Sequence, residues 1–155
     1  MLHMNRPSHS AGGAAFTALV LEIFRLNGRL LAAGDRIGRP HGLTSARWQV
    51  LGALAAGPRT AAQIARAMGL ARQSVQRLVD AMLGDGILAS AVNPEHARAR
   101  LIALTARGRR LYDAVMAGQA AATPLDVASA HAACRTLEAL RRRLEGAGKP
   151  KGARR

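Results

Sequence analysis

The sequence predicts a mainly α-helical fold that carries one small β-hairpin. Three observations predict it: long stretches whose apolar residues recur every three or four positions, two short helices separated by a glycine, and two strand-like segments at 87–92 and 98–104, the second with alternating side chains. The chain has 155 residues, the size of one domain or of one module with an extension for oligomerisation.

Residues 1–12 are polar and predict a disordered tail. A helix is expected from about Gly13 to Ile37, because its apolar residues alternate three- and four-residue steps. This stripe consists of Phe16, Leu19, Ile23, Leu26, Leu30, Ala33 and Ile37, and is widened by Val20, Phe24 and Leu31. So wide an apolar face on one helix has to be buried, and a second copy of the chain is the economical partner.

A second helix is predicted after the break at residues 39–42. Thr44 provides its cap, and it runs to about Ala56, where Gly57-Pro58 ends it. Its apolar residues, Trp48, Val50, Leu51 and Leu54, are expected in the core.

Residues 60–86 predict two short helices joined by a tight turn. Thr60 and Gln63 have the spacing of a capping box, and Gly69 can adopt the left-handed conformation that ends the first helix. The second helix begins at about Ala71 and buries an i, i+3, i+4, i+7 set, Val75, Leu78, Val79 and Met82. Its other face carries Arg72, Gln73, Gln76 and Arg77.

A β-hairpin with a basic tip is predicted next. Residues 87–92 form the first strand, residues 93–96 a turn, and residues 98–104 a second strand with alternating side chains. Two helices in a tight turn, followed directly by a basic hairpin, describe a winged helix-turn-helix. Its second helix would enter the DNA major groove, whereas an ordinary helical hairpin in an all-α core is the alternative.

Two long helices are predicted to complete the chain. Thr105 caps one that runs to about Ala121, and Thr123-Pro124 with Asp126 starts another that runs to about Leu144. The last helix repeats the pattern of the first in Ala130, Ala133, Leu137, Leu140 and Leu144. Residues 146–155 are basic and are expected to be a disordered tail.

The net charge of +14 is unevenly distributed. Residues 59–110 hold nine arginines against three acidic residues, a net +6, and residues 141–155 hold seven basic residues against one acidic residue, also +6. Positive charge on the predicted motif and the tail suits a protein that contacts phosphates.

The chain resembles the MarR family of bacterial transcriptional regulators. The resemblance rests on LTSARWQVLGAL, LARQSVQRLVDAML and VNPEHARARLIALTARG, which lie within residues 43–108. It implies a winged helix at 44–105 and a homodimer held by helices within 13–37 and 106–145. Each winged helix would then read one half of a pseudo-palindromic operator.

The resemblance also implies DNA-binding residues. The family motif places one set against the major groove or its phosphates, Arg72, Gln73, Ser74, Gln76 and Arg77, and Thr60 joins this set at the start of the first motif helix. Arg98 matches the wing arginine that enters the minor groove. Many members have an aspartate two residues before that arginine, whereas this chain has His96. Either the wing is looser than in those members, or Glu95 organises it instead.

A small-molecule effector, such as an aromatic acid, is also implied by the resemblance. The candidate residues lie near the helix junction where family members bind such acids: His41, Arg47, Trp48 and Tyr112. The spacing of Trp48 from Leu51 favours core packing over a role in a pocket.

The sequence offers no motif for catalysis, so we expect no enzyme, no cofactor and no metal site. The five histidines lack metal-ligand spacing, the lone Cys134 suits a buried core position, and no apolar run predicts a membrane span. We therefore expect a cytoplasmic, homodimeric, sequence-specific DNA-binding repressor released by an effector. The alternatives are a basic protein that binds nucleic acid without sequence preference, and an enzyme or scaffold that uses a winged helix for protein contacts.

Overall fold

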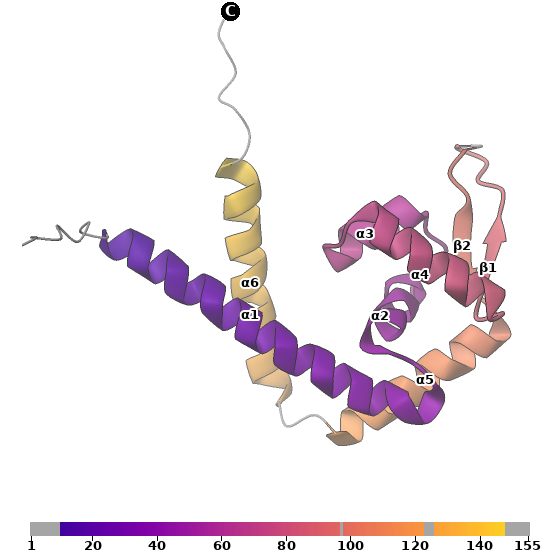
Figure 1. Cartoon of the computed structure of the whole chain (residues 1–155), viewed down its shortest axis with the longest axis horizontal. Coiled ribbons are helices and arrows are strands. Elements are labelled where there is room, and N and C mark those ends of the chain that lie inside the picture. Colours follow the sequence, from indigo (N-terminus) through magenta and orange to yellow (C-terminus); the bar gives the residue numbers. More distant parts are fainter. Residues whose placement is uncertain (1–9, 97, 123–125, 148–155) are drawn as a thin grey trace, which may run out of the picture. The chain divides into compact units, whose positions relative to one another are not determined.

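The computed structural model describes residues 10–96, 98–122 and 126–147, and the chain divides into two units, residues 1–119 and 120–155. Figure 1 shows the order of the elements along the chain. These are α1 (Ala11–Gly38), the 3-10 turn η1 (Arg39–His41), α2 (Ser45–Leu54), α3 (Ala61–Met68), α4 (Arg72–Gly84), β1 (Leu88–Ala91), β2 (Leu101–Leu104), α5 (Ala106–Ala122) and α6 (Val127–Ala147).

The predicted fold class is confirmed: helices dominate, and β1 and β2 form one antiparallel hairpin. Its register pairs Leu88 with Leu104 and Ala91 with Leu101. Arg59 adds a single bridge to Ile102, with one hydrogen bond in each direction at 3.0 and 2.8 Å between their backbone atoms. The segment that leads into α3 is therefore tied to the hairpin.

One continuous hydrophobic core lies in the first unit. The fully buried side chains come from α2, α3, α4 and α5, and α2 packs against α1, α3, α4 and β2. The largest of these side chains are Leu51, Leu54, Ile64, Met82, Val50, Val75, Val79 and Val115. Trp48 packs against this core while partly buried, as its spacing from Leu51 predicts.

The end of α1 meets the start of α2 at very short range. The Asp35 carboxylate accepts a hydrogen bond of 2.6 Å from the backbone N–H of Ser45, at the first position of α2. A Cβ atom at Gly34 would lie 2.6 Å from Ser45 Oγ. Glycine is therefore required here, and the Asp35 carboxylate satisfies one of the free N–H groups of the helix terminus.

Several predicted boundaries need correction. Helix α1 begins at Ala11 because the Ser10 hydroxyl caps it, so only residues 1–9 of the predicted tail lie outside the described residues. Helix α2 ends at Leu54, because the chain turns where Gly57 N–H bonds to the Leu54 carbonyl.

The strands are also shorter than predicted. Ile87 N–H bonds back to the Met82 carbonyl, so β1 starts one residue later, and Ala99 N–H bonds to the His96 carbonyl, so residues 98–100 belong to the turn. Both differences arise because local backbone hydrogen bonds take groups that the ladder would otherwise use.

The last helix starts later and ends later than predicted. The Asp126 carboxylate accepts a 2.8 Å hydrogen bond from Ser129 N–H, so Asp126 is the cap, whereas Thr123 and Pro124 lie outside the described residues. Helix α6 continues to Ala147, three residues past the predicted end, and residues 148–155 of the predicted tail are not described.

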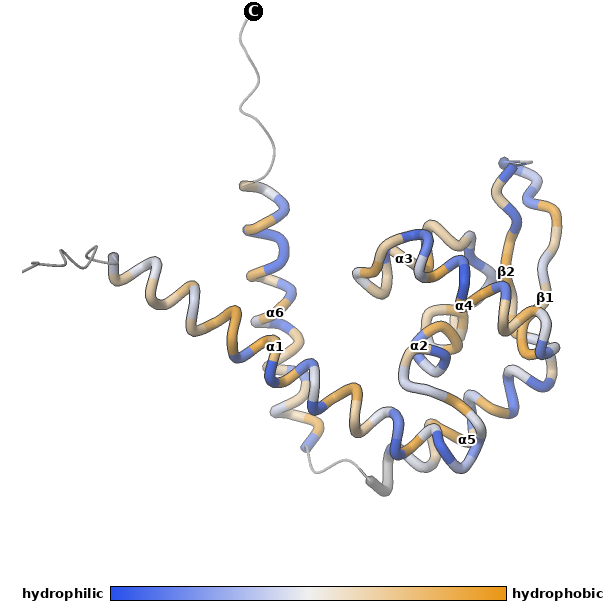
Figure 2. Tube along the Cα trace, in the orientation of Figure 1, coloured by the Kyte–Doolittle hydropathy of each residue, from blue (hydrophilic) through white to orange (hydrophobic). Residues whose placement is uncertain are grey.

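Apolar side chains on α1 and α6 are exposed in the single chain. On α1, Phe16 and Phe24 are 54% and 69% exposed, and on α6 Val127 and Leu144 are 72% and 59% exposed. Cys134 is exposed as well, which contradicts its expected burial. Figure 2 shows apolar and polar residues alternating along both helices. Among the described residues, no helix has the length and apolarity needed to cross a membrane.

Candidate nucleic-acid interface and an adjoining pocket

The turn between α3 and α4 is built from local interactions that the sequence predicts. The Thr60 hydroxyl accepts from Gln63 N–H, and the Gln63 amide oxygen accepts from Thr60 N–H at 2.8 Å, which completes the capping box. Gly69 has a φ of 65°, the left-handed conformation, and Leu70 N–H bonds to the Ala65 carbonyl. The Thr60 hydroxyl therefore makes its hydrogen bond within α3. Thr60 itself lies at the N-terminus of α3, as predicted.

Helix α4 separates a buried face from an exposed one. Val75, Val79 and Met82 are fully buried, and this anchors the helix to the core. The structure brings the predicted α4 residues together on the exposed surface: Arg72, Gln73, Ser74, Gln76 and Arg77. One feature was missed by the sequence reasoning, a 2.8 Å hydrogen bond from Gln76 Nε2 to Asp80 Oδ1, although the i, i+4 spacing signals it.

The wing presents Arg98 and is held by two other residues. Arg98 is exposed in the turn between the strands. Arg100 donates from Nε to Ser90 Oγ at 3.0 Å and from Nη2 to the Ser90 carbonyl at 3.2 Å, which ties the two sides of the hairpin together. The buried Asn93 accepts from Glu95 N–H at 3.0 Å. Asn93 and Arg100, rather than the expected Glu95 carboxylate, therefore organise the wing within the described residues.

The C-terminal end of α4 is fixed from two directions. Arg47 of α2 forms a 2.8 Å ion pair with Asp85, the residue that follows α4, and Arg107 of α5 donates to the Asp85 carbonyl at 2.7 Å. Arg47 was an effector candidate, but the structure places it in this ion pair. The Thr105 hydroxyl, which caps α5 as predicted, also donates toward the carbonyls of Gly86 and Ile87 at 2.9 Å.

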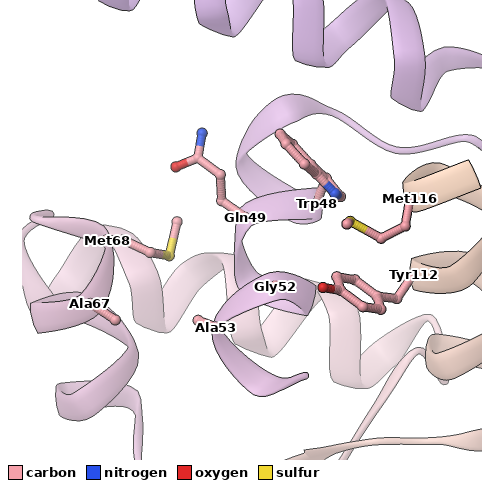
Figure 3. A pocket seen from close by; sticks show the side chains of 8 residues that line it. All are labelled: Trp48, Gln49, Gly52, Ala53, Ala67, Met68, Tyr112 and Met116. Atoms are coloured by element: carbon pink, nitrogen blue, oxygen red, sulfur yellow. The ribbon is translucent and has the colours of Figure 1, made fainter. Parts of the chain in front are cut away.

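An open pocket of about 350 Å³ lies between α2, α3 and α5. Figure 3 shows its lining, which is Trp48, Gln49, Gly52, Ala53, Ala67, Met68, Tyr112 and Met116. The structure thus brings together two of the predicted effector residues, Trp48 and Tyr112, whereas His41 and Arg47 are not in the lining. The volume falls within the range of small-molecule sites.

Two polar features distinguish this pocket. The indole Nε1–H of Trp48 is buried and has no hydrogen-bond partner within the described residues, and Figure 3 shows it on the side of the ring toward Met116 and Tyr112. A buried donor without an acceptor carries a free-energy cost. Arg109 stacks over the Tyr112 ring at 5.9 Å from its centroid and donates to the Ala55 carbonyl, which orients this wall.

Comparison with known proteins identifies the family. The model of the MarR family matches residues 41–99, which include α2, α3, α4 and the first strand of the wing. The chain belongs to the MarR family. This family and its fold are those of transcription regulators.

Two curated relatives share part of the chain. An uncharacterized protein of Mycobacterium bovis is 36% identical over 97 residues, which are 63% of this chain and 68% of the relative. The transcriptional activatory protein BadR of Rhodopseudomonas palustris is 29% identical over 99 residues, which are 61% of this chain and 57% of BadR.

Solved structures share the fold. A MarR family transcriptional regulator from Streptomyces coelicolor aligns with a TM-score of 0.70 and 25% identity, covering 89% of this chain and 100% of its own. The Mycobacterium tuberculosis regulator MosR in complex with DNA aligns with a TM-score of 0.67 and 23% identity, covering 84% of this chain and 98% of its own. CouR from Rhodococcus jostii, bound to p-coumaroyl-CoA, aligns with a TM-score of 0.61 and 23% identity, covering 88% of this chain and 95% of its own.

Proposed function

We propose that this MarR family protein is a homodimeric repressor that binds a pseudo-palindromic operator and is released from it by a small molecule. The observation that carries the proposal is the row of exposed Arg and Gln side chains on α4, whose opposite face is anchored in the core. Arg and Gln are the side chains that make paired hydrogen bonds to guanine and adenine in the major groove. Such a repressor would work in the cytoplasm.

The proposed DNA-binding residues would contact different parts of the duplex. Gln73, Gln76 and Arg77 would read base edges, whereas Arg72 at the start of α4 and Ser74 would contact phosphates. Arg98 would enter the minor groove from the wing, where little beyond A·T against G·C can be distinguished. The N-terminus of α3, with Thr60, would add a phosphate contact through its free N–H groups.

The exposed apolar faces of the long helices support the proposed dimer. Side chains such as Phe24 and Leu30 on α1 and Leu137 and Leu144 on α6 are between 41% and 69% exposed in one chain. A second copy would bury them and would present two α4 helices to successive major grooves, as two half-sites require. The dimerisation helices of the proposal are those within residues 13–37 and 106–145, which flank the DNA-binding residues 44–105.

Affinity measured against single-base operator variants at several salt concentrations tests the reading of DNA. The Gln73→Ala variant should lose about 1–3 kcal/mol per half-site and relax the preference at particular positions. The Arg98→Ala variant should weaken binding to all sequences alike, and it should lower the salt slope by about one per subunit.

The opposite pattern would show that the docking geometry is wrong. In that pattern Arg98→Ala alters the base preference, and Gln73→Ala weakens binding to all sequences equally.

The alternative function is binding of nucleic acid without sequence preference, which the net charge of +14 favours. It predicts that no duplex competes better than bulk DNA at physiological salt, whereas a specific regulator binds its site at least about 1,000-fold more tightly.

The pocket between α2, α3 and α5 supports the proposed effector site. Its lining is mostly apolar and aromatic, and it includes the rings of Trp48 and Tyr112. Among the described residues no charged side chain lines it, so an aromatic acid would insert its ring and keep its carboxylate at the open side. Because the pocket touches α3 and α5, its occupant could change how α4 is presented to DNA.

A ligand screen with a matched blocked variant tests this site. Aromatic acids should quench Trp48 fluorescence and weaken operator binding in the natural chain. A Gly52→Leu variant should lose both effects and still bind the operator, because a Cβ atom at Gly52 meets only Tyr112, at 3.9 Å. Equal responses from both proteins would exclude this pocket as the effector site.

In vitro transcription with and without the ligand distinguishes a repressor from an activator, the role that the name of BadR gives to that relative.

A further inference from the structure

Helix α4 carries an exposed carboxylate whose only described contact is with one of the proposed base-reading side chains. Gln76 Nε2 donates to Asp80 Oδ1 at 2.8 Å, and both residues are exposed on α4. Asp80 lies one turn after Gln76, and helical side chains lean toward the N-terminus, so the carboxylate sits beside the Gln76 amide. A carboxylate next to a DNA-binding face repels phosphates, so its presence there calls for a compensating role.

The chemistry of this pair fixes the orientation of the amide. The two ends of a glutamine amide have nearly the same shape, but one end only accepts hydrogen bonds and the other only donates. An ionised carboxylate can only accept, so it selects the amide orientation with Nε2 toward Asp80. Oε1 is then directed away from Asp80, and the second Nε2 hydrogen remains available for another acceptor.

A fixed amide orientation can distinguish which of the two DNA strands carries the adenine of an A·T pair. Adenine presents its N6 donor and N7 acceptor side by side in the major groove, and glutamine pairs with both. Exchanging A·T for T·A places the adenine on the other strand and reverses the order of this donor and acceptor across the groove. An amide that can turn over pairs with N6 and N7 in either order, whereas an amide held in one orientation pairs with both atoms in only one order.

We propose that Asp80 is a positioning residue for sequence reading, which holds the Gln76 amide so that α4 distinguishes A·T from T·A at one position of each half-site. The inference rests on the proposed function, because it requires Gln76 to contact a base. The competing explanation is an ordinary surface pair that only supports the helix.

The test begins with the full chain and a pool of random duplexes, from which bound sequences are selected and read. Affinities are then measured for the selected duplex and for duplexes in which each A·T pair is reversed symmetrically in both half-sites. The natural chain should discriminate by roughly 5- to 150-fold at the position that Gln76 reads. The Gln76→Ala variant identifies that position by losing the discrimination there.

The Asp80→Asn variant is the decisive one. An asparagine amide can either accept from or donate to Gln76, so it keeps a contact but no longer selects an orientation. Discrimination at the Gln76 position should fall to within about twofold. In the Gln76→Ala background the same substitution should cause no further change in preference, because Asp80 acts through Gln76.

Glu95→Gln is the matched charge control. It also removes one negative charge from an exposed residue of the winged helix, so both variants should bind all duplexes more tightly. Only Asp80→Asn should alter the preference between A·T and T·A. Unchanged melting temperatures would exclude an effect through the fold.

The outcomes separate the two proposals. If the natural chain enriches no sequence, the proposed sequence-specific function fails. If it enriches a motif but Gln76→Ala changes no A·T preference, or Asp80→Asn preserves that preference, the role of Asp80 is refuted while the function stands.

Discussion

The winged helix and the two long helices use the same apolar residue types with opposite results. Leu51, Ile64 and Val79 of the winged helix are fully buried within one chain. Phe24 of α1 and Leu144 of α6 follow an equally regular helical period, yet they remain 69% and 59% exposed. The difference shows that periodicity tells which face of a helix is apolar, whereas burial depends on whether the same chain supplies a second surface.

The winged helix and the long helices therefore depend on different sources of stability. The core of α2, α3 and α4 gains its stability from burial inside one chain. The long helices would gain theirs from a second copy of the chain, so their order should depend on protein concentration. Four changes test this contrast, from the largest expected effect to the smallest.

Placing charge on the exposed stripe of α1 should break the dimer. We expect the double change Ile23→Glu and Leu30→Glu to raise the dimer dissociation constant by at least about 100-fold, because two large apolar side chains lose their partner and two carboxylates lose water. Sedimentation velocity over a range of concentrations measures this. The control Arg29→Glu alters charge on the same helix without touching an apolar side chain, and it should remain dimeric. A stable dimer of the double variant would place the interface elsewhere.

Emptying a core position should affect the winged helix within each chain. Leu51 is fully buried, so Leu51→Ala should lower the free energy of unfolding by about 2–5 kcal/mol. Urea unfolding followed by Trp48 fluorescence measures the loss. The change should be independent of protein concentration over the range where the dimer is intact. A loss below about 1 kcal/mol, on the order of a surface change, would contradict the packing of α2.

The turn between α3 and α4 should resist a side chain. Gly69 has a φ of 65°, and a Cβ atom at this position would meet no heavy atom within 4 Å. Gly69→Val should therefore cost about 1–2 kcal/mol or more through backbone strain rather than through a clash. Gly84 is also open but helical, so the control Gly84→Ala should stabilise by about 0.5–1 kcal/mol. Equal effects at both glycines would mean that Gly69 is not the left-handed turn residue.

The cap of α6 should respond to acid. Hydrogen bonds from the Ser129 side chain and backbone hold the pKa of the Asp126 carboxyl below its ordinary value of 3.8. The ionised cap therefore supports α6 above the ordinary Asp pKa, and this support is lost as the pH falls through the lowered pKa. The Ser129 amide resonance, followed against pH, should show a midpoint below 3.8 that disappears in Asp126→Ala. A midpoint at or above 3.8 would contradict the cap.

What the sequence alone determined is local. The capping box of Thr60 and Gln63, the left-handed Gly69 and the cap at Thr105 each depend on residues within four positions, and all three are present as predicted. Short-range hydrogen bonds are set by residue type and spacing, so a reader of the sequence can find them. The Gln76–Asp80 bond belongs to the same class and was readable from its spacing.

Contacts between distant residues were decided by the tertiary structure. The sequence grouped Arg47 with Trp48 as an effector residue, but the packing of α2 turns Arg47 toward Asp85 and leaves Trp48 beside Tyr112. The wing is held by Arg100 and Ser90 across the hairpin register, not by the neighbouring Glu95 carboxylate. Such partners are fixed only when helices and strands pack at particular distances, because adjacent residues on a helix face different surroundings.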